Sequence, residues 1–158
     1  MKSNQIPGKL RERKGAMRIF EHKHVVTFGE TNLLGNVYFT NFFVWQGECR
    51  EMFLHEYVPE ILTELTNGLS LATTRSNCEF FAEAFAFDEI LVRLKLVELT
   101  QSRVTMGFEY VRMNNNRSEL IARGEQQVVC IRKNGHLTGV SELPPTLHQK
   151  LLEFQQSP

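Results

Sequence analysis

Residues 28–54 join a polar loop to an apolar run that contains a single arginine. The loop carries Asn32 and Gly35, and Arg50 lies within the apolar run. A loop that leads into a helix offers free backbone N–H groups to a ligand carbonyl. A guanidinium inside an apolar helix must face a group that it can pair with. We therefore expect the functional site in this part of the chain.

The usual catalytic motifs are missing. The sequence contains no GxSxG, no Gly-rich phosphate loop and no HExxH, so the common hydrolase, nucleotide and zinc signatures are absent. The five histidines are interpreted as surface residues rather than catalytic bases. Glu48 and Glu51 flank Arg50. Glu51 fits a solvated charge, whereas Glu48 fits either that or a role in the site.

Hydrophobic periodicity predicts the elements that must position these residues. The expected elements are a strand at 18–28, a long helix from residue 42 that ends before Pro59, a short helix at 60–65, about four antiparallel strands through 69–133 with a turn at 114–116, and a short helix after Pro145. This order predicts an α+β fold in which an antiparallel sheet of about five strands wraps around one long central helix.

The strand at 72–80 is expected to have two different faces. Simple alternation places Ala72, Thr74, Ser76, Cys78 and Phe80 on a small-residue face beside the helix, and Thr73 and Arg75 on a polar face. An acyl chain or ordinary core packing would fit the small face equally well. The polar face is expected to meet a partner subunit.

Composition restricts the class of protein further. The formal net charge is zero, which argues against a nucleic-acid partner. Residues 1–17 are basic and poor in apolar residues, so we expect a flexible leader followed by a single domain at 18–158. The three cysteines show no ligand spacing, so we expect neither a metal nor a cofactor. No apolar run is long enough to span a membrane and no signal-peptide core is present, so a cytoplasmic protein is expected.

The run 30–38, followed by Trp45 and Arg50, resembles the signature of hotdog-fold thioesterases of the 4-hydroxybenzoyl-CoA thioesterase type. That signature is an E-T-D-x-x-G-x-V-Y loop that leads into the central helix. This chain has Asn32 at the position of the catalytic Asp and Gly47 where many members carry a helix Glu. Both departures are similar to the thioesterases of enediyne polyketide biosynthesis.

This resemblance implies a specific site and substrate. Asn32 and Arg50 would be the catalytic pair, acting without a catalytic carboxylate on a polyunsaturated β-ketoacyl chain bound to an acyl carrier protein. An amide cannot serve as a general base, but it can donate to a carbonyl oxygen, and Arg50 would stabilise the developing oxyanion. The same Arg50 could assist decarboxylation of the β-keto acid product. The residues expected to bind substrate are Gly35, Tyr38, Phe42, Glu48, Thr73 and Arg75.

The expected partner is the acyl carrier protein domain of an iterative polyketide synthase, and the expected assembly is a homo-oligomer, a dimer of dimers by resemblance. Two other functions remain open from the sequence: an acyl-CoA thioesterase of primary metabolism, and a non-catalytic module that binds acyl groups or acyl carriers. Arg50 could also be a structural counter-ion to Glu48 or to an acidic residue of a neighbouring subunit.

Overall fold

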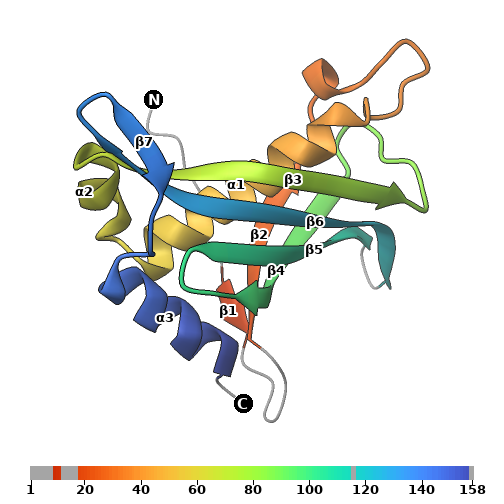
Figure 1. Cartoon of the computed structure of the whole chain (residues 1–158). Helices are drawn as coiled ribbons and strands as arrows, with labels where there is room; N and C mark the ends of the chain where they lie inside the picture. Colours follow the sequence, from red (N-terminus) through yellow and green to blue (C-terminus); the bar gives the residue numbers. More distant parts are fainter. Residues whose placement is uncertain (1–8, 12–17, 115–116, 157–158) are drawn as a thin grey trace, which may run out of the picture.

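A long helix, α1 (Thr40–Tyr57), lies against one face of a curled antiparallel sheet (Figure 1). The computed structural model describes residues 9–11, 18–114 and 117–156. The remaining elements are β1 (Lys9–Arg11), β2 (Ile19–Val25), the 3-10 turn η1 (Phe28–Glu30), α2 (Ile61–Thr66), β3 (Leu69–Phe80), β4 (Glu89–Leu99), β5 (Arg103–Asn114), β6 (Arg117–Asn134), β7 (Leu137–Val140) and α3 (Pro145–Gln156). The sheet order is β1-β2-β4-β5-β6-β3, and β7 pairs with β6. The five long strands around α1 confirm the predicted architecture.

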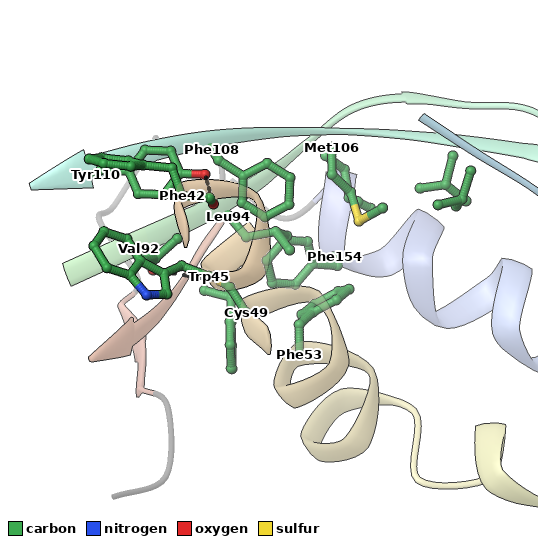
Figure 2. Packing of buried hydrophobic residues seen from close by; sticks show 14 of the residues in the cluster. Phe42, Trp45, Cys49, Phe53, Val92, Leu94, Met106, Phe108, Tyr110 and Phe154 are labelled. Carbon is green, nitrogen blue, oxygen red and sulfur yellow. Dashed lines mark hydrogen bonds between the residues drawn. The ribbon is translucent and has the colours of Figure 1, made fainter. Parts of the chain in front are cut away.

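Helix α1 buries a stripe of side chains at helical spacing. Phe42, Trp45, Cys49 and Phe53 are all at most 3% exposed. They pack against the apolar faces of β4 and β5 and against α3 (Figure 2). Other sides of α1 are less covered, since Val44 is 53% exposed. One side of the helix therefore stays open in a single chain.

A β-bulge in β3 changes which residues face α1. Strand β3 pairs with β6 throughout, but the register shifts between Thr73 and Arg75, so Thr74 is the extra residue. Thr73 points toward α1, where Arg50 donates to its hydroxyl. After the bulge, Ser76 contacts α1 instead. The predicted faces therefore hold for the second half of the strand and are reversed in the first half.

The ends of the chain differ in part from expectation. Lys9–Arg11, inside the predicted flexible leader, forms β1 and pairs with β2. The rest of that leader, 1–8 and 12–17, lies outside the described residues, as do 115–116 of the predicted turn. Strand β7 was not predicted. The terminal helix is confirmed as α3, which contributes Leu147, Leu151 and Phe154 to the core.

Candidate active site

Glu30 anchors the loop that precedes α1. Its Oε2 accepts hydrogen bonds from the Thr27 backbone N–H at 2.7 Å and hydroxyl at 2.9 Å. Its Oε1 accepts from the Trp45 indole N–H at 2.7 Å. Its backbone carbonyl accepts from the Asn41 side chain at 2.8 Å and from the Tyr38 N–H at 2.9 Å. Burial opposes ionisation of this carboxyl, but the bonds from Thr27 and Trp45 outweigh it together, so the pKa of Glu30 is lowered.

Sequence reasoning gave Glu30 no role. Two signals point to it: Thr27 and Glu30 have the spacing of a capping box, and a buried indole N–H such as that of Trp45 needs an acceptor. Because Glu30 joins the loop to the middle of α1, it fixes where the following residues lie.

Asn32 lies in the turn that Glu30 holds. Its Oδ1 accepts from the Leu34 N–H at 2.8 Å, and its backbone pairs with Asn36 and Gly35. Gly35 adopts φ +86°, a conformation that residues with a Cβ rarely accept. Within the described part of the chain, Nδ2 of Asn32 has no hydrogen-bond partner. The amide is therefore oriented with its donor group free.

Arg50 is half-buried, and its described hydrogen bonds go to neutral side chains. Its Nη1 donates to Gln126 Oε1 at 2.8 Å and to Thr73 Oγ1 at 3.2 Å. Its Nη2 lies 3.8 Å from a carboxylate oxygen of the exposed Glu51. Burial lowers the pKa of Arg50 and Glu51 raises it less, yet a guanidinium stays cationic at any ordinary pH.

Glu48 does not pair with Arg50. Its Oε2 lies 3.7 Å from Nδ1 of His24, whose Nε2 is 2.8 Å from Glu30 Oε1. This second contact is short but does not have the angle of a hydrogen bond, and the buried Nε2 has no hydrogen-bond partner among the described residues. The His24 ring also packs 4.7 Å from Trp45, centroid to centroid. The alternative that Arg50 is the counter-ion of Glu48 is therefore not observed.

The other residues expected at the site lie in different environments. Tyr38 is 50% exposed on the loop. Phe42 is 3% exposed and contacts the rings of Trp45, Phe80 and Tyr110, so its side chain belongs to the core. Arg75 forms an exposed ion pair with Glu125.

A single chain joins some of these residues and separates others. Arg50 meets Thr73 within one chain, although Thr73 was expected to face a partner subunit, and Gln126 joins them without having been predicted. Asn32 lies in the loop before the N-terminal end of α1, whereas Arg50 lies ten residues into α1 from Thr40, which is about 15 Å along the axis. No described contact connects Asn32 to Arg50.

One surface hollow borders the site, and a larger one lies elsewhere. The first, of about 440 Å³, lies between α1, α2 and β3 and is bordered by Arg50. The larger one, of about 610 Å³, is lined by residues from Phe87 to Glu89 and around the β5–β6 hairpin, and it includes none of the predicted site residues. Across the described ranges, no cluster of three His, Cys, Asp or Glu side chains is arranged to hold a metal. None of the helices described has the length and apolarity needed to cross a membrane.

Known proteins similar to this chain agree on the fold. The family described as the Thioesterase-like superfamily matches residues 26–151. The chain is 44% identical to the dynemicin thioesterase, whose crystal structures reveal induced-fit and allosteric effects upon polyene binding. That match covers 85% of this chain and 95% of that one, with a TM-score of 0.80.

More distant structures share the fold alone. A 1,4-dihydroxy-2-naphthoyl-CoA thioesterase from Synechocystis is 22% identical, with a TM-score of 0.74, and covers 85% of this chain and 96% of its own. A 4-hydroxybenzoyl-CoA thioesterase mutant complexed with 4-hydroxybenzoyl-CoA is 16% identical, with a TM-score of 0.74, and covers 87% of this chain and 99% of its own. No curated protein sequence matches the chain significantly.

Proposed function

The chain belongs to the Thioesterase-like superfamily and is a hotdog-fold thioesterase, and we propose that its substrate is a polyunsaturated β-ketoacyl thioester bound to an acyl carrier protein. The setting would be enediyne-type polyketide biosynthesis. The 44% identity to the dynemicin thioesterase supports this substrate class. The observation that carries the proposed chemistry is the state of Arg50, a half-buried cation whose hydrogen bonds within the described residues go to the neutral Thr73 and Gln126, with the exposed Glu51 carboxylate 3.8 Å away.

Asn32 and Arg50 would stabilise the oxyanion rather than move the proton. Because Leu34 occupies Oδ1 of Asn32, the amide presents Nδ2 as a donor. Arg50 uses only Nη1 for its described hydrogen bonds, so other guanidinium N–H groups remain for a ligand oxygen. One oxyanion donor typically contributes about 3 kcal/mol of barrier lowering. Two such donors would give a useful rate on a thioester, which is already activated.

The reaction would proceed by attack of water on the thioester carbonyl. The new C–O bond forms, the carbonyl becomes an oxyanion held by Asn32 and Arg50, and the C–S bond then breaks. The carrier thiol takes up the proton that water loses. Both carboxylate oxygens of Glu30 are occupied by Thr27 and Trp45, which supports hydrolysis without a catalytic carboxylate.

Antiparallel pairing of two copies would bring the two residues together. β3 is an edge strand with a free side for pairing. If two β3 strands pair about a twofold axis near their centre, Phe80 of one copy lies opposite Leu69 of the other. Asn36 of the Asn32 loop donates to Glu83, which follows the Phe80 end of β3, so the loop lies near that end. In the pair, the loop would approach Arg50 of the other copy. A dimer is thus the smallest complete enzyme, and a dimer of dimers would be the full assembly.

The proposed product is a β-keto acid. Such acids lose CO2 through an enol, and a cation such as Arg50 would stabilise the enolate formed in that step. The proposed location is the cytoplasm, where the carrier domain of an iterative polyketide synthase would deliver the substrate.

Turnover of matched thioesters tests the proposal. The purified protein is given the same medium-chain β-ketoacyl group on an acyl carrier protein and on CoA, and release of free thiol is followed. We expect faster hydrolysis of the carrier thioester. Comparable or faster hydrolysis of the CoA thioester would favour an acyl-CoA thioesterase of primary metabolism. Binding of both with no turnover would favour a non-catalytic acyl-binding module.

A further inference from the structure

An apolar groove of about 440 Å³ runs between α1, α2 and β3. Its apolar walls are Met52 and Leu54 from α1, Ile61, Leu62 and Leu65 from α2, and Leu71 from β3. This volume falls within the range of pockets that hold small organic ligands, about 300–1,000 Å³. Leu62 and Leu65 are 57% and 42% exposed to water. Covering this apolar surface with an apolar ligand is therefore favourable.

The cation at the border of the groove indicates which ligand would fit. Arg50 lies where α1 meets β3, fixed by Thr73 of β3, and it borders the groove directly. Arg50, Leu54 and Leu71 also border a second space of about 10 Å³ that reaches toward the core. A ligand that matches this arrangement has a polar carbonyl or carboxylate head at Arg50 and a long apolar tail along α2.

The path expected from the sequence lacks such space. Phe42 is packed among three aromatic rings and is 3% exposed. The bulge at Thr74 turns the first half of the small-residue face away from α1. Neither feature provides an open channel beside Arg50, whereas the groove under α2 does.

We propose that the α1–α2–β3 groove binds the acyl chain of the thioester substrate, with the thioester carbonyl at Arg50 and the chain between α1 and the leucines of α2. The inference rests on the proposed function and adds the site that measures chain length. Helix α2 becomes the specificity element of the enzyme. Its six residues are held at one end by buried Ile61 and at the other by the Arg132–Glu64 ion pair at 3.1 Å, which leaves Leu62 and Leu65 facing the chain.

Filling the groove tests the assignment. Leu65→Trp places an indole in the groove, and Thr63→Trp places the same side chain on the exposed face of the same helix as a matched control. The probe is parinaric acid, a fluorescent conjugated polyene carboxylate. Each buried methylene contributes about fourfold to binding, so Leu65→Trp should raise the Kd at least about tenfold. Thr63→Trp should match the wild type.

Hydrolysis provides the second readout. For Leu65→Trp, the ratio of kcat/KM for hexadecanoyl thioester to kcat/KM for acetyl thioester, both on the carrier protein, should fall below the wild-type ratio, whereas Thr63→Trp should keep that ratio. Equal parinaric acid binding and equal long-chain turnover by the two tryptophan variants would overturn the proposal. A Leu65→Trp variant that loses self-association but still binds parinaric acid would also overturn it, because the groove would then be a subunit interface. If the wild type hydrolyses no thioester, the proposed function fails, while the parinaric acid comparison still decides whether the groove binds acyl chains.

Discussion

At the level of single residues, Arg50 and Asn32 are held in opposite ways. Arg50 is fixed through its guanidinium by Thr73 and Gln126, whereas Asn32 is fixed through its acceptor oxygen and leaves its donor free. Both arrangements leave N–H groups without a hydrogen-bond partner among the described residues, so these groups would be available to a ligand oxygen. Neither leaves a group that can accept a proton from water, so the two residues should act as one electrostatic unit.

Substitution of the pair tests this unit. Arg50→Met and Asn32→Ala should each lower kcat by at least about one order of magnitude, the usual effect of losing an oxyanion donor being about 10²–10³. The double variant should lose less than the product of the two effects, because residues that act as a unit are not additive. Steady-state hydrolysis of the carrier thioester measures all three.

Thermal unfolding is the control for Arg50. Breaking a buried ion pair costs about 3–5 kcal/mol, but Glu48 faces His24 and not Arg50. Arg50→Met should therefore destabilise the fold by less than that. A folded Arg50→Met protein that hydrolyses its substrate at the full rate would refute the catalytic role.

Glu30 should make stability depend on acid pH. Its folded pKa is lowered, so it stabilises the fold above its unfolded pKa of about 4.3, and this contribution is lost as the pH falls through the lower folded value. Glu30→Gln should lower the unfolding temperature at pH 7 and flatten its decline below about pH 4.3. Thermal melts between pH 3 and 7 measure this, with the exposed Glu60→Gln as control. Parallel pH curves for wild type and Glu30→Gln would contradict the assignment.

The sequence contained enough information for some of these residues. Arg50 stands out as a lone arginine in an apolar helix, and the Thr27–Glu30 spacing of a capping box was available. The contact of Arg50 with Gln126 spans 76 positions in the chain. It depends on how β6 pairs with β3, which no local pattern encodes.

At the level of elements, a buried amide fixes α1 against β3 and β6. Gln46 is fully buried, donates to the Asn77 carbonyl at 3.0 Å and accepts from the Ser76 hydroxyl at 2.9 Å. Gly124 of β6 makes room for it: a Cβ there would lie 2.2 Å from Gln46 Nε2 and 2.7 Å from the Asn77 carbonyl oxygen. The close approach of the helix to the sheet thus depends on this glycine.

Two glycine substitutions should have opposite effects. Gly124→Ala should destabilise the fold by about 1–3 kcal/mol, because the Asn77 backbone must shift. Gly47→Ala on α1 meets nothing within 4 Å and should stabilise the fold by about 1 kcal/mol, because alanine favours the helix. Chemical denaturation measures both. If Gly124→Ala were as stable as the wild type, Gln46 would not be the contact that sets the helix position.

The elements also show where periodicity is insufficient. The long helix and strand β4 follow their apolar patterns closely, since each buries one regular face, whereas β5 is buried continuously from Val104 to Phe108. The bulge at Thr74 breaks the alternation of β3 without any Gly or Pro to mark it. One inserted residue therefore exchanged the expected orientations of Thr73 and Thr74, which is why the contact of Thr73 with Arg50 within one chain was not predicted.

At the scale of the whole molecule, the loop of Asn32 carries apolar residues that one chain leaves uncovered. Leu33 and Leu34 are 105% and 87% exposed, and Phe28 and Phe87 nearby are 72% and 68% exposed. Exposed patches of this kind usually mark an interface. Their position next to Asn32 places the expected interface at the proposed site.

Polar replacement of the two leucines tests that interface. Leu33→Asn with Leu34→Asn should keep the fold, because both side chains are solvent-exposed in one chain. The double variant should shift sedimentation at micromolar concentration from dimer or larger toward monomer, and hydrolysis should fall with it. Sedimentation of the wild type as monomer alone would contradict the assembly.

Mixing two inactive variants decides whether one site uses residues from two copies. In a heterodimer of Asn32→Ala with Arg50→Met, one site carries both substitutions and the other combines the intact Asn32 with the intact Arg50. Random exchange makes half of the dimers mixed, so the mixture should regain about one quarter of wild-type activity. Each variant incubated with itself is the control and should stay inactive. If both residues serve the thioester from the same chain, every site carries one substitution and no activity returns. The Asn32 loop of one chain would then have to reach across the roughly 15 Å of helix between Thr40 and Arg50.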